Sequence, residues 1–401
     1  MKGMNVILWC LLVVYLLACG PKQSLRQNDS ILIIDIDKRD YPIEDVDINA
    51  IADVEYIPLE TTDESIIPNG NAGFYVTDSL IITSSIHSGE VFFFDRKGSF
   101  LYKVCRLGNS GKEYSRLSEL IVDFVSKELL VYSAGERKIQ IYDFDGDYQR
   151  TLRLPTDDFV VNELYNYDDD YLIGCNYKYS YLEKKHADNH PYYLISKKNG
   201  NLINLPLFIE DRIDFCVNRE VVTFSGGAYS NNTYFKIDQL NNNGTDMIIG
   251  DFALDTIYCY RDYKLTPIAL KIPPVKSKNP RRIVAVEFVS DYFIRFRIID
   301  MVYIPDAPQK PFDESPELVW DKRGKRFRHW KVYDYNYSTK IKPDFPRARW
   351  SDLPRNYGVS SYRAEKLIEQ YEKGELKGKL KEVASKLKED DNRVVILCKY
   401  K

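Results

Sequence analysis

The stretch Val91–Val104 reads VFFFDRKGSFLYKV and has the form of two short strands joined by a turn that contains Gly98. The same form recurs at Ile139–Leu152 (IQIYDFDGDYQRTL) and at Tyr192–Leu205 (YYLISKKNGNLINL). Glycine suits such a turn because it adopts positive φ angles without a Cβ clash. A β-hairpin that returns about every 50 residues is typical of a β-propeller, a ring of small sheets called blades.

Two looser copies of the hairpin lie at Ile257–Leu270 and at Trp330–Pro343. In the clearest copies the strand before the turn is apolar at consecutive positions, as in Val91–Phe94. A strand has this composition when neighbouring sheets cover both of its faces. A further apolar run stands before each of the first two copies, so each unit has enough strands for a four-stranded blade.

The expected fold class is all-β, a six-bladed β-propeller with a C-terminal amphipathic helix. Five blades are predicted, at Ala72–Val104, Ser118–Leu154, Val160–Pro206, Asp211–Pro273 and Arg281–Phe345. The sixth is predicted to combine the C-terminal strand with N-terminal strands, and its closing pair is Val54–Leu59 with Val394–Tyr400. Because the later units are longer, we expect loop insertions at Lys178–Pro191, Ser225–Asn232 and Pro305–Glu317.

The segment from about 361 to 389 departs from the strand pattern. Leu376, Leu380, Val383 and Leu387 have the spacing of one face of an α-helix, and lysines occupy much of the remainder. This stripe predicts a helix that packs on the propeller rim and exposes a basic face to solvent. A helix that binds a partner or a membrane surface would have the same pattern.

The N-terminus has the features of an export signal. Lys2 precedes an apolar run, Val6–Leu17, that is too short to span a bilayer. Leu16-Leu17-Ala18-Cys19 resembles a lipobox, which implies removal of residues 1–18 and lipidation of Cys19. Several acyl chains on one residue would anchor the protein stably. We therefore expect a location in the cell envelope, on the outer membrane, in either leaflet.

The predicted organisation of the remaining chain follows from these patterns. Residues 19–40 form a polar tether with a possible first strand at Ile31–Ile34, and residues 41–401 form the propeller, with a closing strand at about 394–400.

Four stretches resemble the six-bladed β-propeller lipoproteins of Gram-negative bacteria, whose architecture is related to TolB-like and NHL-type propellers. They are Tyr56–Thr62 (YIPLETT), the repeated strand with its Asp and Gly (Phe94-Asp95, Gly98), Gly108–Tyr114 (GNSGKEY), and Glu389–Asn392 (EDDN) with the strand after it. Lys112 and the lack of a proline in the third stretch depart from the commoner form, as does Arg393 in place of a proline. The resemblance implies the fold and the envelope location, but no activity.

The charge balance argues against nucleic-acid binding. Without the signal segment, the 56 Lys and Arg lose Lys2, which leaves 55 against 59 Asp and Glu. Such a chain has no excess positive charge with which to hold phosphates. The 31 tyrosines suit half-buried strands, where the ring packs and the hydroxyl stays in water. Surfaces that bind carbohydrate also use aromatic side chains.

Five cysteines remain after the signal segment and the lipobox, and none of them forms a C-x-x-C pair: Cys105, Cys175, Cys216, Cys259 and Cys398. An odd number of cysteines on strand-like segments argues against a disulfide framework. We expect most of them to be small buried side chains, and one disulfide stays open as an alternative.

No motif of catalysis, metal binding or cofactor binding is present. Asp143–Asp147 resembles a calcium loop, but Tyr148 and Leu154 occupy the positions of its required Gly and Glu. His186 and His190 have a metal-ligand spacing, but Pro191 disfavours the helix that this spacing needs. We therefore predict no catalytic residue, no metal ligand and no cofactor.

A late cluster of aromatic and basic residues is the candidate binding surface. It spans Trp320 to Trp350, and we select Trp330, Trp350, Arg347 and Arg349 as candidate binding residues. Stacking and cation–π contacts there would hold an anionic or sugar ligand. Strand packing with a solvated face would also explain the cluster.

The sequence favours a lipid-anchored, non-catalytic binding or scaffolding module for an envelope protein or a glycan. The alternative is a propeller hydrolase or lyase that acts on glycan or peptide at the central axis, where each blade would contribute one residue. A third hypothesis is an envelope sensor that signals to a membrane partner.

Overall fold

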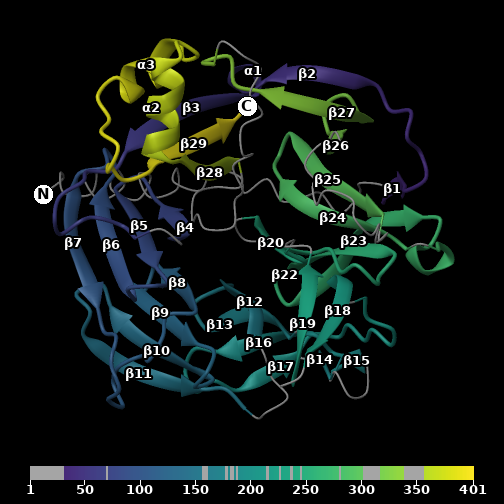
Figure 1. Cartoon of the computed structure of the whole chain (residues 1–401). Coiled ribbons are helices and arrows are strands. Elements are labelled where there is room, and N and C mark those ends of the chain that lie inside the picture. The colour runs from purple at the N-terminus through teal and green to yellow at the C-terminus, as the bar shows by residue number, and fades with distance from the viewer. Residues whose placement is uncertain are drawn as a thin grey trace, which may run out of the picture.

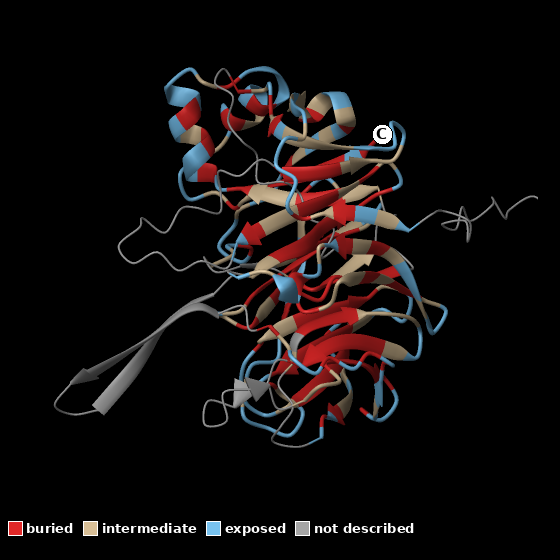
Figure 2. Cartoon of the chain, turned by 90° about the vertical axis from the view of Figure 1, so that its right-hand side faces the viewer, coloured by how far each residue is buried: buried red, intermediate tan, exposed pale blue. Residues whose placement is uncertain are grey.

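The computed structural model describes residues 31–68, 71–155, 161–176, 179–180, 185–186, 188–213, 216–224, 227–234, 238–243, 246–279, 281–300, 317–337 and 356–401. Six small sheets stand around a central axis in a ring (Figure 1). The predicted all-β, six-bladed propeller is therefore confirmed, and the buried residues lie mainly on its strands (Figure 2).

Blades 1–3 are four-stranded antiparallel sheets built from consecutive chain. Blade 1 holds β4 (Asn71–Val76), β5 (Leu80–Ser85), β6 (Glu90–Asp95) and β7 (Phe100–Cys105). Blade 2 holds β8 (Glu119–Asp123), β9 (Glu128–Ser133), β10 (Lys138–Asp143) and β11 (Tyr148–Arg153). Blade 3 holds β12 (Val161–Asn166), β13 (Tyr171–Asn176), β16 (Tyr192–Ser196) and β17 (Leu202–Asn204).

Each of blades 4–6 takes its outermost strand from the N-terminal segment. Blade 4 holds β20 (Leu240–Asn243), β21 (Asp246–Ile249), β22 (Thr256–Arg261), β23 (Lys264–Ile272) and then β1 (Leu32–Asp35). Blade 5 holds β24 (Arg282–Val289), β25 (Phe293–Asp300), β26 (Glu317–Asp321), β27 (Arg326–Tyr333) and then β2 (Ile43–Asp47). Blade 6 holds β28 (Tyr357–Tyr362), β29 (Val394–Tyr400) and β3 (Ala52–Pro58).

Shorter elements connect or extend the blades. They are α1 (Ile48–Ile51) between β2 and β3, the 3₁₀ turn Val275–Ser277 after β23, the pair β14 (Tyr179–Ser180) and β15 (Lys185–His186), and the hairpin β18 (Cys216–Phe224) and β19 (Gly227–Tyr234). β14 and β15 lie within the first predicted insertion, Lys178–Pro191, whereas the second, Ser225–Asn232, overlaps only β19, because the hairpin begins earlier, at Cys216. Residues 305–316 of the third lie outside the described residues.

The predicted ring closure is confirmed, because β3 pairs with β29 and places Ile57 opposite Val395. The prediction that several N-terminal strands join blade 6 is wrong. β1 and β2 instead pair in parallel with β23 and β27, the fourth strands of blades 4 and 5. Nothing in their sequence distinguishes these three outer positions, since each strand is short and partly apolar.

The position predicted for the fifth copy of the hairpin, Trp330–Pro343, is wrong. The hairpin of blade 5 is β26–β27, and Trp330 lies within its second strand. Its turn falls in the charged run Asp321–Arg326. Gly324 lies there among basic residues, so the sequence does not mark it as a turn glycine. The fourth copy is confirmed as β22–β23.

The repeated glycines have a second use, which is close contact between blades. Gly98, Gly146 and Gly200 have φ angles of 91°, 83° and 76°. Each packs on the outer strand of the preceding blade, where an added Cβ would lie 2.2 Å from Pro58 O, 2.6 Å from Val104 Cγ1 and 2.8 Å from Arg153 O, respectively. The glycine that marks the turn in the sequence therefore also sets the spacing between neighbouring blades.

The C-terminal helix is confirmed, but it is divided into α2 (Ala364–Glu372) and α3 (Gly378–Ala384). Gly374 and Gly378 have positive φ angles, 71° and 53°, and interrupt it. Leu376 and Leu380 are buried in the core that α3 shares with blade 6, as the rim-packing interpretation predicts. In the part of the chain that the structure describes, no helix is long and apolar enough to span a membrane.

Candidate functional site

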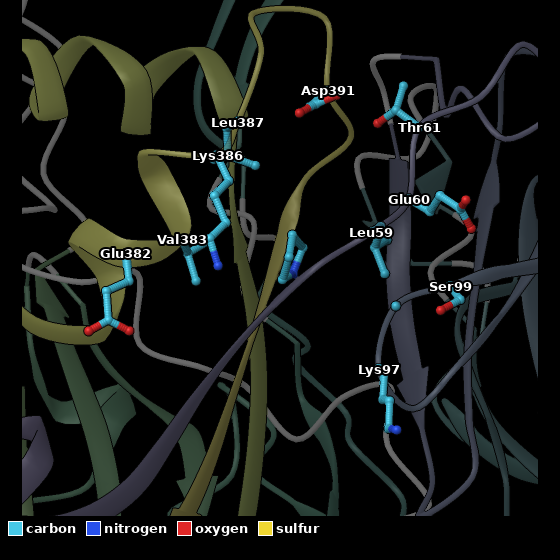
Figure 3. Close-up of a pocket in the computed structure, with 12 residues that line it drawn as sticks. Leu59, Glu60, Thr61, Lys97, Ser99, Glu382, Val383, Lys386, Leu387 and Asp391 are labelled. Carbon is cyan, nitrogen blue, oxygen red and sulfur yellow. The ribbon is translucent and has the colours of Figure 1, made fainter.

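A groove of about 420 Å³ lies where blade 6 meets blade 1. One wall is formed by the end of β3 and by the turn between β6 and β7, and the other by α3 and the residues after it (Figure 3). We call it the closure groove. Its lining comprises Pro58–Thr61, Lys97–Ser99, Glu382, Val383, Lys386, Leu387 and Asp391.

Asn392 fixes the chain that follows β3. Its side-chain Nδ2 donates to Glu60 O at 2.9 Å and to Ser65 O at 2.8 Å, and its Oδ1 accepts from Ile67 N at 2.9 Å. Asn392 is buried, so these bonds are shielded from water. The stretches YIPLETT and EDDN, which are far apart in sequence, thus meet at the closure groove.

The β6–β7 turn is held just as firmly. Glu60 N donates to Gly98 O at 2.8 Å, and Phe100 N donates to Glu60 Oε2 at 2.7 Å. Within the turn, Asp95 Oδ1 accepts from Lys97 N and Ser99 N at 2.8 and 2.9 Å. The hydrogen bond from the Ser99 backbone lowers the pKa of the Asp95 carboxyl. This wall is therefore rigid and pre-formed.

The α3 wall presents two kinds of side chain. Val383 and Leu387 are half-buried and belong to the edge of the hydrophobic core beneath the helix. Glu382 and Lys386 are exposed beside them. Asp391 Oδ2 accepts from Lys388 N at 2.8 Å, which orders the turn after the helix.

The lining of the closure groove combines apolar and charged side chains. Leu59 (3% exposed) of the first wall, together with Val383 and Leu387 of the α3 wall, forms the apolar part of the lining, which we call the floor. Charges of both signs surround this floor: Lys97, Lys386, Glu60, Glu382 and Asp391. None of the lining residues is aromatic, whereas sugar-binding surfaces rely on aromatic stacking. An apolar side chain flanked by polar main chain and charged groups would fit such a groove.

Of the binding residues predicted from sequence, Trp330 lies among the described residues and does not line this groove. Trp330 is half-buried in β27 and packs on Phe293, with ring centroids 5.1 Å apart. Trp350, Arg347 and Arg349 lie outside the described residues, as does Cys19. Of the cluster's other members, Arg328 pairs with Glu44 of β2, which is a strand-packing role.

The cysteine prediction is largely confirmed, because Cys175, Cys259 and Cys398 are buried, and burial raises the pKa of Cys398. Cys105 is exposed on β7. His190 packs on Phe208 at 5.3 Å. Among the described residues, no group of three or more His, Cys, Asp or Glu side chains is placed to hold a metal ion.

Sequence reasoning missed a cluster of buried charges in blade 5. Arg295, which is 1% exposed, lies 3.3 Å from Glu287 and 3.5 Å from Glu317, and Arg297 lies 2.6 Å from Glu287. The cluster could have been suspected from the sequence, because charged residues stand inside the otherwise apolar runs RIVAVEFV and FIRFRIID. The two pairs of opposite charges compensate one another, which indicates a structural role.

Polar groups on the inner strands join neighbouring blades. Glu163 of β12 accepts from the backbone of Gln239 and Leu240 at 2.9 and 2.8 Å. Asn241 of β20 donates to Val286 O of β24 at 2.8 Å. These groups therefore serve blade assembly. The alternative of an enzyme at the axis stays a prediction.

Residues 32–270 match the family described as "Domain of unknown function (DUF4934)", and the chain belongs to this family. The matched region extends from β1 to β23, which are the two strands that pair in blade 4. A comparison with curated proteins gave no match.

Solved structures share the architecture at low identity. A "Putative exported protein" from Bacteroides fragilis is 14% identical, with a TM-score of 0.60 over 90% of this chain and 99% of that chain. A DUF4221 family member from Bacteroides vulgatus is 10% identical, with a TM-score of 0.49 over 87% and 96%. Virginiamycin B lyase from Staphylococcus aureus is 10% identical, with a TM-score of 0.34 over 71% and 94%. At these identities the likeness concerns the fold alone.

Proposed function

We propose that this member of the DUF4934 family is an exported, lipid-anchored binding module of the cell envelope, and that its closure groove recognises a polypeptide segment of a partner. The observation that carries the proposal is the groove itself. Ring closure places an apolar floor between two walls held in position by backbone hydrogen bonds and core packing. A pre-formed concave site loses little conformational entropy on binding.

The envelope location is supported by two independent features. The sequence Leu16–Cys19 resembles a lipobox, and the similar propeller from Bacteroides fragilis is described as an exported protein. We propose that Cys19 carries the lipid and that the outer membrane is the destination. Metabolic labelling with an alkyne fatty acid tests this proposal, because labelling should be lost in the Cys19→Ala variant. Equal labelling of both forms would contradict it.

A polypeptide is a better ligand for the groove than a glycan. The floor is aliphatic, and the surrounding charges are of both signs, which favours a segment with an apolar anchor and polar neighbours. Burying one aliphatic side chain there would contribute about 1.5–3 kcal/mol. Hydrogen bonds and ion pairs around the floor would then determine the register of the segment.

The test uses a random-peptide display library and the purified chain. We expect enriched peptides whose binding, followed by fluorescence anisotropy, is lost in Val383→Glu and in Leu387→Glu. The matched control is Val125→Glu, because Val125 is 79% exposed in the β8–β9 turn, away from the groove. The proposal is wrong if no peptide is enriched, or if the enriched peptides bind all variants equally.

A further inference from the structure

Five of the six outermost strands are very short, carry at least two charged residues or end in proline, and these features discourage pairing with another chain. β17 is only three residues long, and β1 is four residues long and ends in Asp35. β2 and β3 carry acidic residues along their length, and β3 also ends in Pro58. β11 carries Arg150 and Arg153. Short length, charge and proline are the usual protections of a sheet edge.

The sixth outermost strand, β7, is protected least, because it has one charged side chain, Lys103, and a single irregularity in its pairing with β6, at Leu101. It is six residues long and reads FLYKVC. Leu101 and Tyr102 are 47% and 37% exposed, and Lys103 lies 2.9 Å from Glu90 of β6, within the same blade. Among the described residues, no strand pairs with its outer edge. An exposed apolar edge of this length is a template for strand addition.

The protein already uses strand addition at the corresponding edges of two other blades. β1 lies parallel to β23, with Leu32 opposite Ala269, and β2 lies parallel to β27, with Ile43 opposite His329. In both blades an extended segment becomes a fifth strand. The blade architecture therefore accepts a parallel strand outside its fourth one.

The edge of β7 is continuous with the closure groove. Lys97, Gly98 and Ser99 line the groove, and β7 begins at the next residue, Phe100. Since Phe100 N already donates to Glu60, strand pairing would begin at Leu101. We propose that the polypeptide bound in the groove continues along β7 as a fifth, parallel strand of blade 1. This inference rests on the proposed function and supplies its binding mode.

Such a ligand has a defined chemistry. Its N-terminal part places an apolar side chain in the groove. The part that follows is extended, carries few charges and has apolar side chains at alternate positions, which pack on Leu101 and Tyr102. Its free backbone N–H groups bond to β7.

The experiment uses the enriched peptides of the display selection. We expect Leu101→Lys and Tyr102→Lys each to weaken binding about tenfold, because a charge is placed on the added strand's contact face. N-methylation of the peptide's C-terminal half should weaken binding similarly, since it removes backbone donors. The control Val125→Lys should bind as the unmodified chain does, and circular dichroism melts establish that each variant is folded.

The direction of the bound peptide is tested by a mixed disulfide between the peptide and Cys105, which is exposed at the end of β7. A peptide that bears an activated cysteine near its C-terminus should react faster than one that bears it near its N-terminus, and neither should react with Cys105→Ser. The reverse order would overturn the parallel arrangement.

The outcomes separate the two proposals. If groove variants abolish binding while edge variants and N-methylation have no effect, the groove function stands and strand addition is wrong. If no peptide depends on the groove, both proposals fall. A concentration-dependent dimer in sedimentation that Leu101→Lys abolishes would assign the edge to a second copy, and would also overturn the inference.

Discussion

In blades 1–3 the last strand of each sheet is the outer edge, whereas in blades 4–6 that edge belongs to β1, β2 or β3 (Figure 1). The contacts between blades differ as well. Gly98, Gly146 and Gly200 let the turns of blades 1–3 pack on backbone or side chain of the preceding blade. Blade 4 instead has Asp262 and Tyr263 at positive φ angles, 48° and 60°.

A side chain replaces this close backbone contact in blade 4. Tyr263 OH donates to Asp168 Oδ2 of the preceding blade at 2.5 Å. Blades with the same arrangement of inner strands are therefore joined in two ways. The first depends on repeated glycines, and the second on side-chain bonds together with strands from the other end of the chain. The following predictions test whether blades 1–3 and blades 4–6 depend on these two kinds of contact.

The largest effect is expected from Arg295→Met in blade 5. The substitution removes the ion pairs that Arg295 makes with Glu287 and Glu317, and the loss of a buried opposite charge is costly. We expect a loss of about 4–5 kcal/mol in the free energy of unfolding, measured by urea denaturation.

The counterpart in blades 1–3 is Lys197, which lies 2.6 Å from Asp123. Burial alone would raise the pKa of Asp123, but the bond with Lys197 lowers it. Lys197→Met should cost less, about 3 kcal/mol, because Asp123 also accepts from Val125 N and Ser126 N. A loss below 1 kcal/mol for Arg295→Met would show that the later blades do not depend on this cluster.

The second prediction concerns Lys271 of β23, which is 1% exposed and lies opposite Ile34 of β1. Burial lowers its pKa from 10.5 to about 8, although Asp251 and Asp255 offset part of the change. Above pH 8 the folded chain has released this proton, while the unfolded chain keeps it until about pH 10.5. Folding stability should therefore rise with pH across this window.

The measurement is urea denaturation of the natural chain and Lys271→Met at several pH values. Relative to the variant, the natural chain should gain about 2–3 kcal/mol between pH 8 and pH 10.5. A constant difference between the two proteins would contradict the lowered pKa.

The third prediction concerns the glycine contacts of the earlier half. Gly98→Ala should destabilise the protein by about 2 kcal/mol, because the new Cβ meets Pro58 O and the φ angle is unfavourable for alanine. The control is Gly374→Ala, where φ is also positive but no atom lies within 4 Å of the added Cβ. The control should cost about 1 kcal/mol. Equal losses of stability in the two variants, measured by thermal melts, would contradict a role of Gly98 in the spacing of the blades.

The smallest effect is expected where the N-terminal segment crosses from blade 4 to blade 5. Arg282 donates to Ile36 O at 3.0 Å, to Asp37 at 3.1 Å and to Asp300 at 3.1 Å. Arg282→Gln should cost about 0.5–1 kcal/mol, and less at high salt, because these charges are partly exposed.

Hydrogen exchange over residues 32–37 provides the local measurement for Arg282→Gln. Arg326→Gln is the control, since its side chain is 61% exposed and lies 3.9 Å from Asp321. Unchanged exchange at low salt would contradict the role of Arg282 in holding the segment.

The inner part of the fold could be predicted because the hairpins are local. The turn and both strands of Val91–Val104 are contiguous, and apolar residues occupy both faces. The positions of β1 and β2 could not be predicted, since parallel pairing over such long sequence separation leaves no local pattern. Strand closure was an exception, because only Val394–Tyr400 remained at the C-terminus to pair with Val54–Leu59.

The closure groove could be predicted only in part. YIPLETT, the glycine turn and EDDN were recognised as separate stretches, but their meeting depends on ring closure and on the position of α3. The lysine-rich helix indicated a rim surface, yet its groove-facing residues are Val383 and Leu387. The candidate surface near Trp330 rested on composition, and composition does not distinguish a packed strand from a ligand site.

The crossing of the N-terminal segment over three blades also constrains how the chain folds. β1, β2 and β3 are synthesised before blades 1–3, yet they pair with β23, β27 and β29, which follow those blades in the chain. The first strands must therefore stay extended and unpaired while blades 1–3 form. Late contacts of this separation slow folding and prolong the exposure of strand edges. A chain that is released early would keep blades 1–3 but leave three N-terminal strands without partners, and so would be prone to aggregate.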